Sequence, residues 1–161
     1  RYAPGAVLAL FHDTVLVIGI FILTQKQFDL TILAALLALI GYSNNDTIIV
    51  YDRVRESIHM HPEYSVEKAV NIAINETLGR TIITSITTFF ATFTLWMWGG
   101  SVIENFAFTL MCGVIVGTYS SIFVASSLII AWTQYIKKRE DNLKRTGKKF
   151  KRKEYKPRYS V

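Results

Sequence analysis

Residues 30–50 of the chain read LTILAALLALIGYSNNDTIIV, an apolar run that holds a single charged side chain, Asp46. A helix needs about 20 mostly apolar residues to cross a bilayer, so this run is long enough to span one. Further apolar runs of similar length occupy residues 7–23, 81–98 and 106–132. We therefore predict an all-α polytopic membrane protein whose four transmembrane helices form one bundle within residues 1–134.

The composition fits a membrane protein with segregated charges. Hydrophobic residues make up 51% of the chain, yet 19% of the residues are charged. The single cysteine, Cys112, lies inside the fourth apolar run, which excludes a disulfide or a cysteine-rich metal site within this chain. No nucleophile elbow, phosphate loop or zinc signature occurs, and His59 and His61 lie in a polar loop without matching ligands. We expect neither an enzyme nor a metal or organic cofactor.

The distribution of basic residues predicts how the chain crosses the membrane. Of the 18 lysines and arginines, twelve lie between Lys137 and Arg158. Four more lie in the connection between the second and third runs, namely Arg53, Arg55, Lys68 and Arg80. Because basic segments stay on the cytoplasmic side, we expect loop 52–80 and the C-terminal tail to be cytoplasmic and the two short turns to face outward.

Two segments outside the apolar runs have contrasting patterns. Ser65 is a good helix cap, and apolar residues recur at helical spacing after it, which predicts an amphipathic surface helix over about 65–79. Residues 135–161 mix lysine, arginine and other polar residues without apolar periodicity, which predicts a basic, disordered tail. We interpret this tail as an anchor beside anionic membrane lipids rather than as a specific nucleic-acid contact.

Three ionisable residues lie in or beside the apolar runs: Asp13, Asp46 and Arg80. A charge at the bilayer centre costs about 2.5 to 3.5 kcal/mol on insertion scales, so each one needs a partner, water or a function. A rise of about 1.5 Å per residue puts both carboxylates roughly 9 Å from the cytoplasmic ends of their helices, within reach of a long arginine side chain. We predict an ion-coupling site from these three residues. The alternative is a structural role, as a buried ion pair for Asp46 or a local polar contact beside His12 for Asp13.

Polar residues recur on one face of the second helix and on one face of the third. The two stripes consist of Tyr42, Ser43, Asp46 and Arg53 on the second helix, and of Arg80, Thr84, Thr87, Thr88 and Ala91 on the third. If they face each other, they form a wettable path beside Asp46. The predicted supporting polar residues are Tyr42, Ser43, Asn45, Thr84 and Thr88, with Asn45 expected to bridge neighbouring helices.

Small residues recur at every fourth position of the last apolar run, at Gly113, Gly117, Ser121 and Ala125. Such a stripe lets helix backbones approach closely, so we predict that Gly113, Gly117 and Ser121 mediate helix packing. Because the pattern is common in membrane bundles, it indicates no particular function.

Several linked segments resemble one family of bacterial export proteins. The segment GYSNNDT at residues 41–47, continued by DRVRE at residues 52–56, resembles the fourth-helix signature of the SecF family. His12 and Asp13, TLGRTIITS at residues 77–85 and GTYSSIF at residues 117–123 agree in order and spacing. The resemblance covers about Ala6 to Tyr135. One departure is Asn44, where the family usually has an apolar residue.

The resemblance implies half of a transporter of the RND superfamily in the bacterial inner membrane. This chain is similar to helices three to six of such a half. In the complete six-helix half, a large extracytoplasmic domain would lie between helices one and two. Since the sequence lacks an initiating methionine, we expect it to be part of a longer chain. The implied partners are SecD, possibly fused to the same polypeptide, the SecYEG translocon, and preproteins that contact the extracytoplasmic domain.

The resemblance also implies a function: promoting late preprotein translocation with a gradient of H⁺ or Na⁺. Asp46 and Arg80 match the membrane-embedded charges that the family uses for ion coupling, and Asp13 is an auxiliary candidate. Protonation of Asp46 would weaken its attraction to Arg80 and shift the helix packing. Two alternatives are another RND-type exporter of lipids or drugs, and a translocon scaffold without transport activity.

Overall fold

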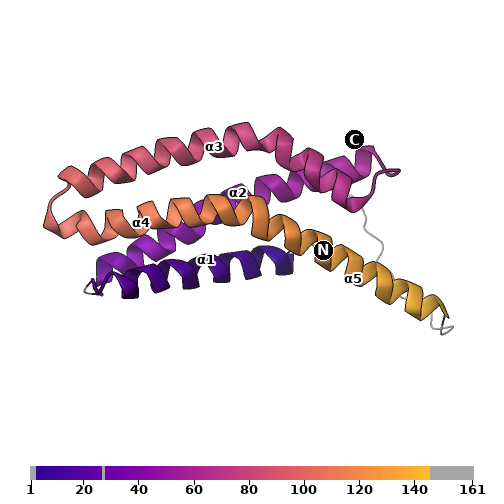
Figure 1. Cartoon of the computed structure of the whole chain (residues 1–161), viewed down its shortest axis with the longest axis horizontal. Helices are drawn as coiled ribbons and strands as arrows, with labels where there is room; N and C mark the ends of the chain where they lie inside the picture. Colours follow the sequence, from indigo (N-terminus) through magenta and orange to yellow (C-terminus); the bar gives the residue numbers. More distant parts are fainter. Residues whose placement is uncertain (1–2, 27, 146–161) are drawn as a thin grey trace, which may run out of the picture.

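The computed structural model describes residues 3–26 and 28–145, and helices make up this part of the chain almost entirely (Figure 1). The elements are α1 (Ala3–Leu23), α2 (Leu30–Met60), α3 (Val66–Trp98), α4 (Ser101–Tyr119), the π-helical turn η1 (Ser120–Val124) and α5 (Ala125–Arg145). No β-strand occurs among the described residues. Four of the helical stretches are long and apolar enough to cross a membrane. The predicted all-α, multi-pass class is confirmed.

Helices α1 to α4 lie side by side in one bundle (Figure 1). The α1–α2 and α3–α4 turns lie at one end, and the α2–α3 turn lies at the other. Helix α4 packs against α1, α2 and α3. Helix α5 continues from α4 through η1 and projects beyond the bundle at the end that carries the α2–α3 turn.

Local side-chain chemistry explains where several helices begin. The carboxylate of Asp29 accepts hydrogen bonds from the backbone N–H groups of Thr31 and Ile32, at 2.8 and 3.1 Å, and caps α2. Ser65 caps α3 in the same way, as its pattern predicts. Between α3 and α4 the backbone turns at Gly100 with a φ of 77°, a conformation that glycine adopts without steric cost.

The bundle has two apolar clusters with polar residues between them. The cluster toward the α2–α3 turn contains Ala9, Val50, Tyr51, Val54, Val70, Ala73, Ala125 and Ile129. The cluster toward the opposite end contains Val17, Phe21, Ile32, Leu36 and Leu39. Buried polar side chains lie between the clusters, and we call them the polar layer: Asp13, Ser43, Asp46, Thr47, Thr81, Ser85, Ser120 and Ser121. The apolar clusters therefore enclose the polar layer along the bundle axis.

Two helices extend past the apolar runs that identified them. Residues 66–79, expected as a separate surface helix, form the first part of α3, which continues without interruption to Trp98. Helix α2 likewise continues from the apolar run through Met60. No proline lies between Glu63 and Trp98 to interrupt the backbone hydrogen bonds, so the polar and apolar halves of α3 form one rod.

The predicted disordered tail also differs from the structure in its first part. Residues 135–145 belong to α5, although they were expected to be disordered. Lysine, arginine, glutamate and leucine are good helix formers, so a helix that begins in the apolar run propagates through them. The rest of the predicted tail, residues 146–161, lies outside the described residues.

Candidate functional site

Asp13 joins α1 to α2 inside the bundle. The residue is 1% exposed. The hydroxyl of Ser43 donates a hydrogen bond to its Oδ2 at 2.5 Å, and His12 Nδ1 lies 3.0 Å from its Oδ1. Ser43 in turn contacts α4, because a Cβ at Gly117 would lie 3.3 Å from the Cβ of Ser43. Both oxygens of this carboxyl group therefore have a partner.

Asp46 is also buried, with 5% of the residue exposed, but its surroundings differ. Its Oδ2 atom has no hydrogen-bond partner among the described residues. A buried carboxylate oxygen without a partner loses its hydration without compensation. The arrangement suits a carboxyl group that exchanges a cation.

Arg80 does not pair directly with either carboxylate. Its side chain is exposed on α3, and within the described part of the chain it forms no ion pair of 4.0 Å or less with Asp13 or Asp46. Its positive charge acts on Asp46 over a longer distance. The structure therefore separates the three predicted ion-coupling residues: Asp13 contacts Ser43 and His12, while Arg80 is paired with neither carboxylate.

Three hydroxyl side chains connect α2, α3 and α4. Tyr42 Oη lies 3.2 Å from Ser85 Oγ, and Thr118 Oγ1 lies 2.7 Å from the same atom. Thr118 Oγ1 also lies 2.6 Å from the carbonyl oxygen of Val114 in its own helix. We call Tyr42, Ser85 and Thr118 the hydroxyl triad. Tyr42 precedes Asp46 by one helical turn on the same face of α2.

The predicted polar stripe of α3 is rotated away from the bundle interior. Thr84 is exposed and Thr88 is half-buried, and their hydroxyls donate to the carbonyl oxygens of Arg80 and Thr84 in the same helix. The polar residues that α3 buries are Thr81, Ser85 and Thr92. On α2, Asn45 is also exposed. Of the five predicted supporting residues, Tyr42 and Ser43 make polar contacts to other helices of the described bundle.

Ser85 and Thr118 were not predicted as site residues. The sequence does contain a pattern that includes Ser85, because Thr81, Ser85 and Thr92 repeat at helical spacing as regularly as the predicted stripe with Thr84 and Thr88. Two threonine and serine stripes share α3, and their spacing does not reveal which of them faces inward.

The small residues of α4 lie against α2. A Cβ at Gly113 would lie 2.5 Å from Leu39 Cδ1, closer than the side chain allows without moving. Gly117 lies against Ser43 in the same manner, one turn further along both helices. Ser121 is fully buried, and its hydroxyl donates to the carbonyl oxygen of Thr118 at 3.0 Å. The absence of side chains at the two glycines thus brings α4 directly onto the polar layer.

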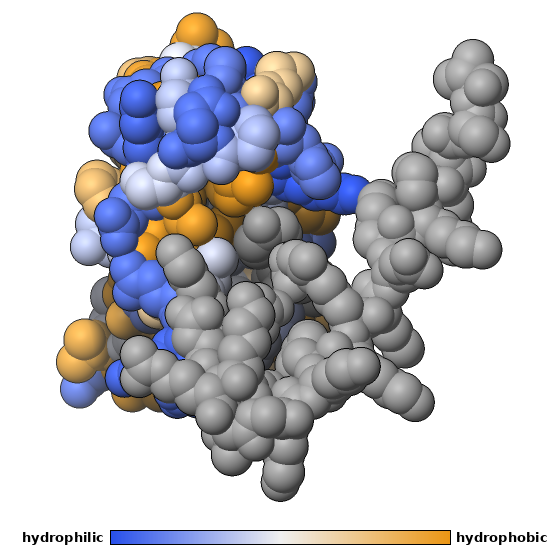
Figure 2. Space-filling view, turned by 90° about the vertical axis from the view of Figure 1, so that its right-hand side faces the viewer, coloured by the Kyte–Doolittle hydropathy of each residue, from blue (hydrophilic) through white to orange (hydrophobic). Residues whose placement is uncertain are grey.

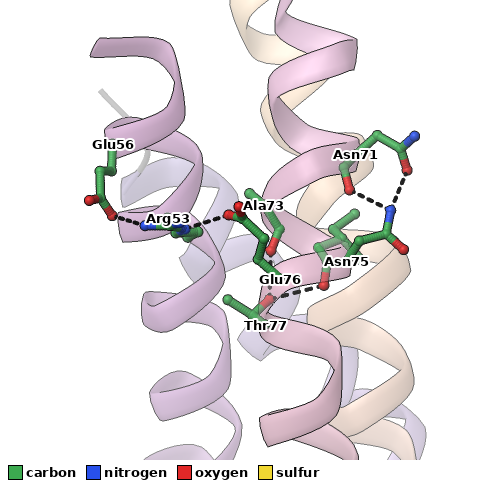
Figure 3. A network of polar contacts seen from close by, with 8 residues as sticks. Arg53, Glu56, Asn71, Ala73, Asn75, Glu76 and Thr77 are labelled. Atoms are coloured by element: carbon green, nitrogen blue, oxygen red, sulfur yellow. Dashed lines mark hydrogen bonds and ion pairs between the residues drawn. The ribbon is translucent and has the colours of Figure 1, made fainter. Parts of the chain in front are cut away.

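An ion-pair network ties α2 to α3 near their shared turn (Figure 3). Arg53 Nε donates to Glu76 Oε2 across the two helices, and Arg53 Nη1 donates to Glu56 Oε2 within α2, each at 2.5 Å. Figure 2 looks onto this end of the bundle, where hydrophilic residues gather over the α2–α3 turn. Arg53 lies two turns beyond Asp46 on the same face of α2, so the network lies between Asp46 and this polar end.

At the opposite end a second ion pair joins the α1–α2 turn to the start of α4. Lys26 Nζ lies 2.9 Å from Glu104 Oε1 and 5.1 Å from the centre of the Phe108 ring. Both ends of the bundle therefore hold neighbouring helices together through charged side chains, whereas the polar layer does so through hydrogen bonds.

Comparison with known proteins identifies relatives that share most of this chain. The Protein translocase subunit SecF of Calditerrivibrio nitroreducens is 55% identical over 130 residues, which cover 80% of this chain and 43% of the relative. The subunit of the same name from Desulfurispirillum indicum is 50% identical over 154 residues, which cover 92% of this chain and 48% of the relative. The chain thus spans less than half the length of these relatives.

A solved structure and a family model agree with these relatives. A chain of the crystal structure of SecDF in its super-membrane-facing form superposes with a TM-score of 0.82 and 40% sequence identity, covering 88% of this chain and 19% of that one. The model of the protein export membrane protein SecD/SecF, C-terminal, matches residues 1–135. With this match and the burial of charged and polar residues inside a four-span bundle, the chain belongs to the SecD/SecF family of protein-export membrane proteins.

Proposed function

We propose that this chain is the membrane-embedded, ion-coupling part of a SecF subunit, which uses a gradient of H⁺ or Na⁺ to promote late preprotein translocation. The observation that carries the proposal is Asp46, a buried carboxyl group with an unpartnered oxygen in the middle of a transmembrane bundle. The relatives are named as protein translocase subunits, which supports protein translocation as the process that Asp46 serves.

The coupling follows from the charge of Asp46. Ionised, the carboxylate is attracted by Arg80 and by any cation that enters the polar layer. Neutralised by a bound proton or sodium ion, it loses that attraction, and α2 and α3 are free to repack. One charge moved across 100 mV supplies about 2.3 kcal/mol, enough to bias two helix arrangements of similar energy. Repeated cycles convert the gradient into movement.

The proposal includes an orientation and partners. The basic α2–α3 connection and the C-terminal end lie in the cytoplasm of a bacterium, and the bundle spans its inner membrane. SecD supplies the complementary half, the SecYEG translocon supplies the channel, and preproteins contact a domain outside this chain. These assignments rest on the relatives, of which this chain covers less than half.

The test is Asp46→Asn in the protein as it is assembled in its native membrane. Preprotein export is followed in membrane vesicles with and without an imposed proton or sodium gradient, and assembly with SecD is checked on the same membranes. Asp52→Asn is the matched control, because Asp52 is an exposed aspartate on the same helix. We expect Asp46→Asn to lose the gradient-dependent part of export and Asp52→Asn to retain it.

Which gradient supports wild-type export identifies the ion. Gradient-dependent export that survives Asp46→Asn in an assembled complex would favour a scaffold without transport activity and reject ion coupling through this residue. Gradient-dependent movement of a lipid or drug in place of preprotein would favour another RND-type exporter.

A further inference from the structure

The three hydroxyls of the triad form one continuous hydrogen-bond chain. Each hydroxyl has one hydrogen to donate and can also accept. Since Thr118 Oγ1 lies 2.6 Å from the Val114 carbonyl oxygen, its hydrogen goes there, and Ser85 donates to Thr118 while Tyr42 donates to Ser85. In this order every hydroxyl of the triad donates once, and the chain ends at a backbone carbonyl group.

The triad lies on one side of Asp46 and the ion-pair network on the other. The contacts Tyr42–Ser85 and Arg53–Glu76 fix the antiparallel register of α2 and α3. Asp46 lies between these contacts on the same face of α2. Along α2 the triad therefore lies between Asp46 and the apolar cluster that contains Leu36 and Leu39, on the side of the α1–α2 and α3–α4 turns. The network lies on the other side of Asp46, toward the α2–α3 turn; Figure 1 shows the two ends.

We propose that the triad of Tyr42, Ser85 and Thr118 is the seal that closes the path between Asp46 and the end of the bundle with the α1–α2 and α3–α4 turns. Its bonds hold α2, α3 and α4 together at this level of the bundle, so water and ions reach Asp46 from that end only when the triad parts. The inference rests on the proposed role of Asp46 in ion coupling and adds the positioning residues that control access to it.

The triad differs from the other hydroxyls of α3 in what it connects. Thr84 and Thr87 donate to carbonyl oxygens of α3 itself, so these bonds are unaffected when α3 moves relative to its neighbours. The triad instead crosses α2, α3 and α4, and a shift of any one of these helices breaks it. It is placed to open when the charge of Asp46 changes and the helices repack.

The seal is tested by the rate at which a water-soluble carbodiimide labels the carboxyl group of Asp46. The reagent is applied to vesicles of either orientation that contain the full, assembled protein, and labelled Asp46 is quantified by peptide mass spectrometry. We expect Ser85→Ala and Thr118→Val to accelerate labelling from the sealed end between about two-fold and about ten-fold, the range that corresponds to the loss of one hydrogen bond. Labelling from the opposite end stays unchanged.

Matched variants separate the seal from general loosening of the bundle. Thr84→Ala and Thr87→Val remove hydroxyls from the same helix and are expected to keep the wild-type rate. Thr118→Ser retains the hydroxyl and is expected to restore the slow rate, and Tyr42→Phe provides a milder change if the other variants fold poorly. Equal acceleration from both ends, an unchanged rate in all triad variants, or no labelling of Asp46 in any of them overturns the proposal.

The outcome is independent of the coupling test. If Asp46→Asn retains gradient-dependent export, the coupling role is wrong, yet the labelling rates still report whether the triad limits access. If coupling through Asp46 is confirmed but triad variants label at the wild-type rate, the path from that end runs elsewhere in the bundle.

Discussion

Asp13 and Asp46 lie in the same polar layer, one on α1 and one on α2, but their carboxyl groups meet different surroundings. Asp13 contacts Ser43 and His12 through its two oxygens. Asp46 has an oxygen without a hydrogen-bond partner among the described residues. The two residues are almost equally buried, so burial alone does not distinguish their roles. The difference lies in how fully each carboxyl group is hydrogen-bonded.

On the function proposed above, this difference separates a structural carboxylate from the ion-coupling one. A saturated group such as Asp13 stabilises the arrangement of helices that supplies its partners, and losing it leaves those partners unpaired. An unsaturated group such as Asp46 is poorly stabilised in its charged form and gains when it is neutralised. In the proposed mechanism, Asp13 therefore holds α1 against α2, and Asp46 is the carboxyl group that changes state.

The largest stability effect is expected for Asp13→Ala. The substitution leaves the buried hydroxyl of Ser43 without its acceptor and opens a cavity between α1 and α2, which together cost about 2 to 4 kcal/mol. Thermal unfolding of the purified protein in lipid nanodiscs, followed by circular dichroism, measures the loss. Asp13→Asn keeps an acceptor oxygen and is expected to recover most of it.

A double-mutant cycle sharpens the assignment to the Ser43 contact. Ser43→Ala alone is expected to cost less than Asp13→Ala, and the double variant is expected to cost less than the sum of the two. Additive losses would show that the buried contact is not what stabilises this part of the bundle.

Asp46→Asn is expected to behave in the opposite way. Neutralising a buried carboxylate with an unpartnered oxygen removes a desolvation cost and keeps the shape of the side chain. In the same unfolding assay the variant is expected to equal the wild type or to exceed it by about 1 kcal/mol. A loss as large as that of Asp13→Ala would make Asp46 a structural residue and break the comparison between the two carboxylates.

Hydropathy was sufficient to find the fold class and both buried carboxylates. Apolar runs of membrane length identify the four long helices, and a charge inside such a run is conspicuous, as with Asp13 and Asp46. The helix ends were less predictable. In α3 and α5 the helices continue into polar residues with good helix propensity, so hydropathy changes where the backbone conformation does not.

The hydroxyl triad could not be predicted from the sequence, for a different reason. A serine or threonine hydroxyl in a helix bonds either to its own backbone, as Thr84 does, or to a neighbouring helix, as Ser85 does. Both choices have the same spacing along α3, and the rotation of the helix decides between them. That rotation is set by packing against α2 and α4, which a pattern within α3 does not contain.

Asp29 provides the smallest effect and a control for the comparison, because its carboxylate is partnered like that of Asp13 but lies at the exposed start of α2. The Thr31 hydroxyl and the N–H groups of Thr31 and Ile32 hold the pKa of Asp29 below its ordinary value of 3.8. A group with a lowered pKa in the folded state contributes stability above its unfolded pKa and loses it as the pH falls through the folded pKa. The cap is therefore expected to contribute fully at neutral pH and to fade below about pH 4. Asp29→Ala should lower the unfolding temperature slightly at pH 7 and not at the acidic limit, whereas an equal loss at both pH values would mean that the ionised carboxylate does not act as the cap.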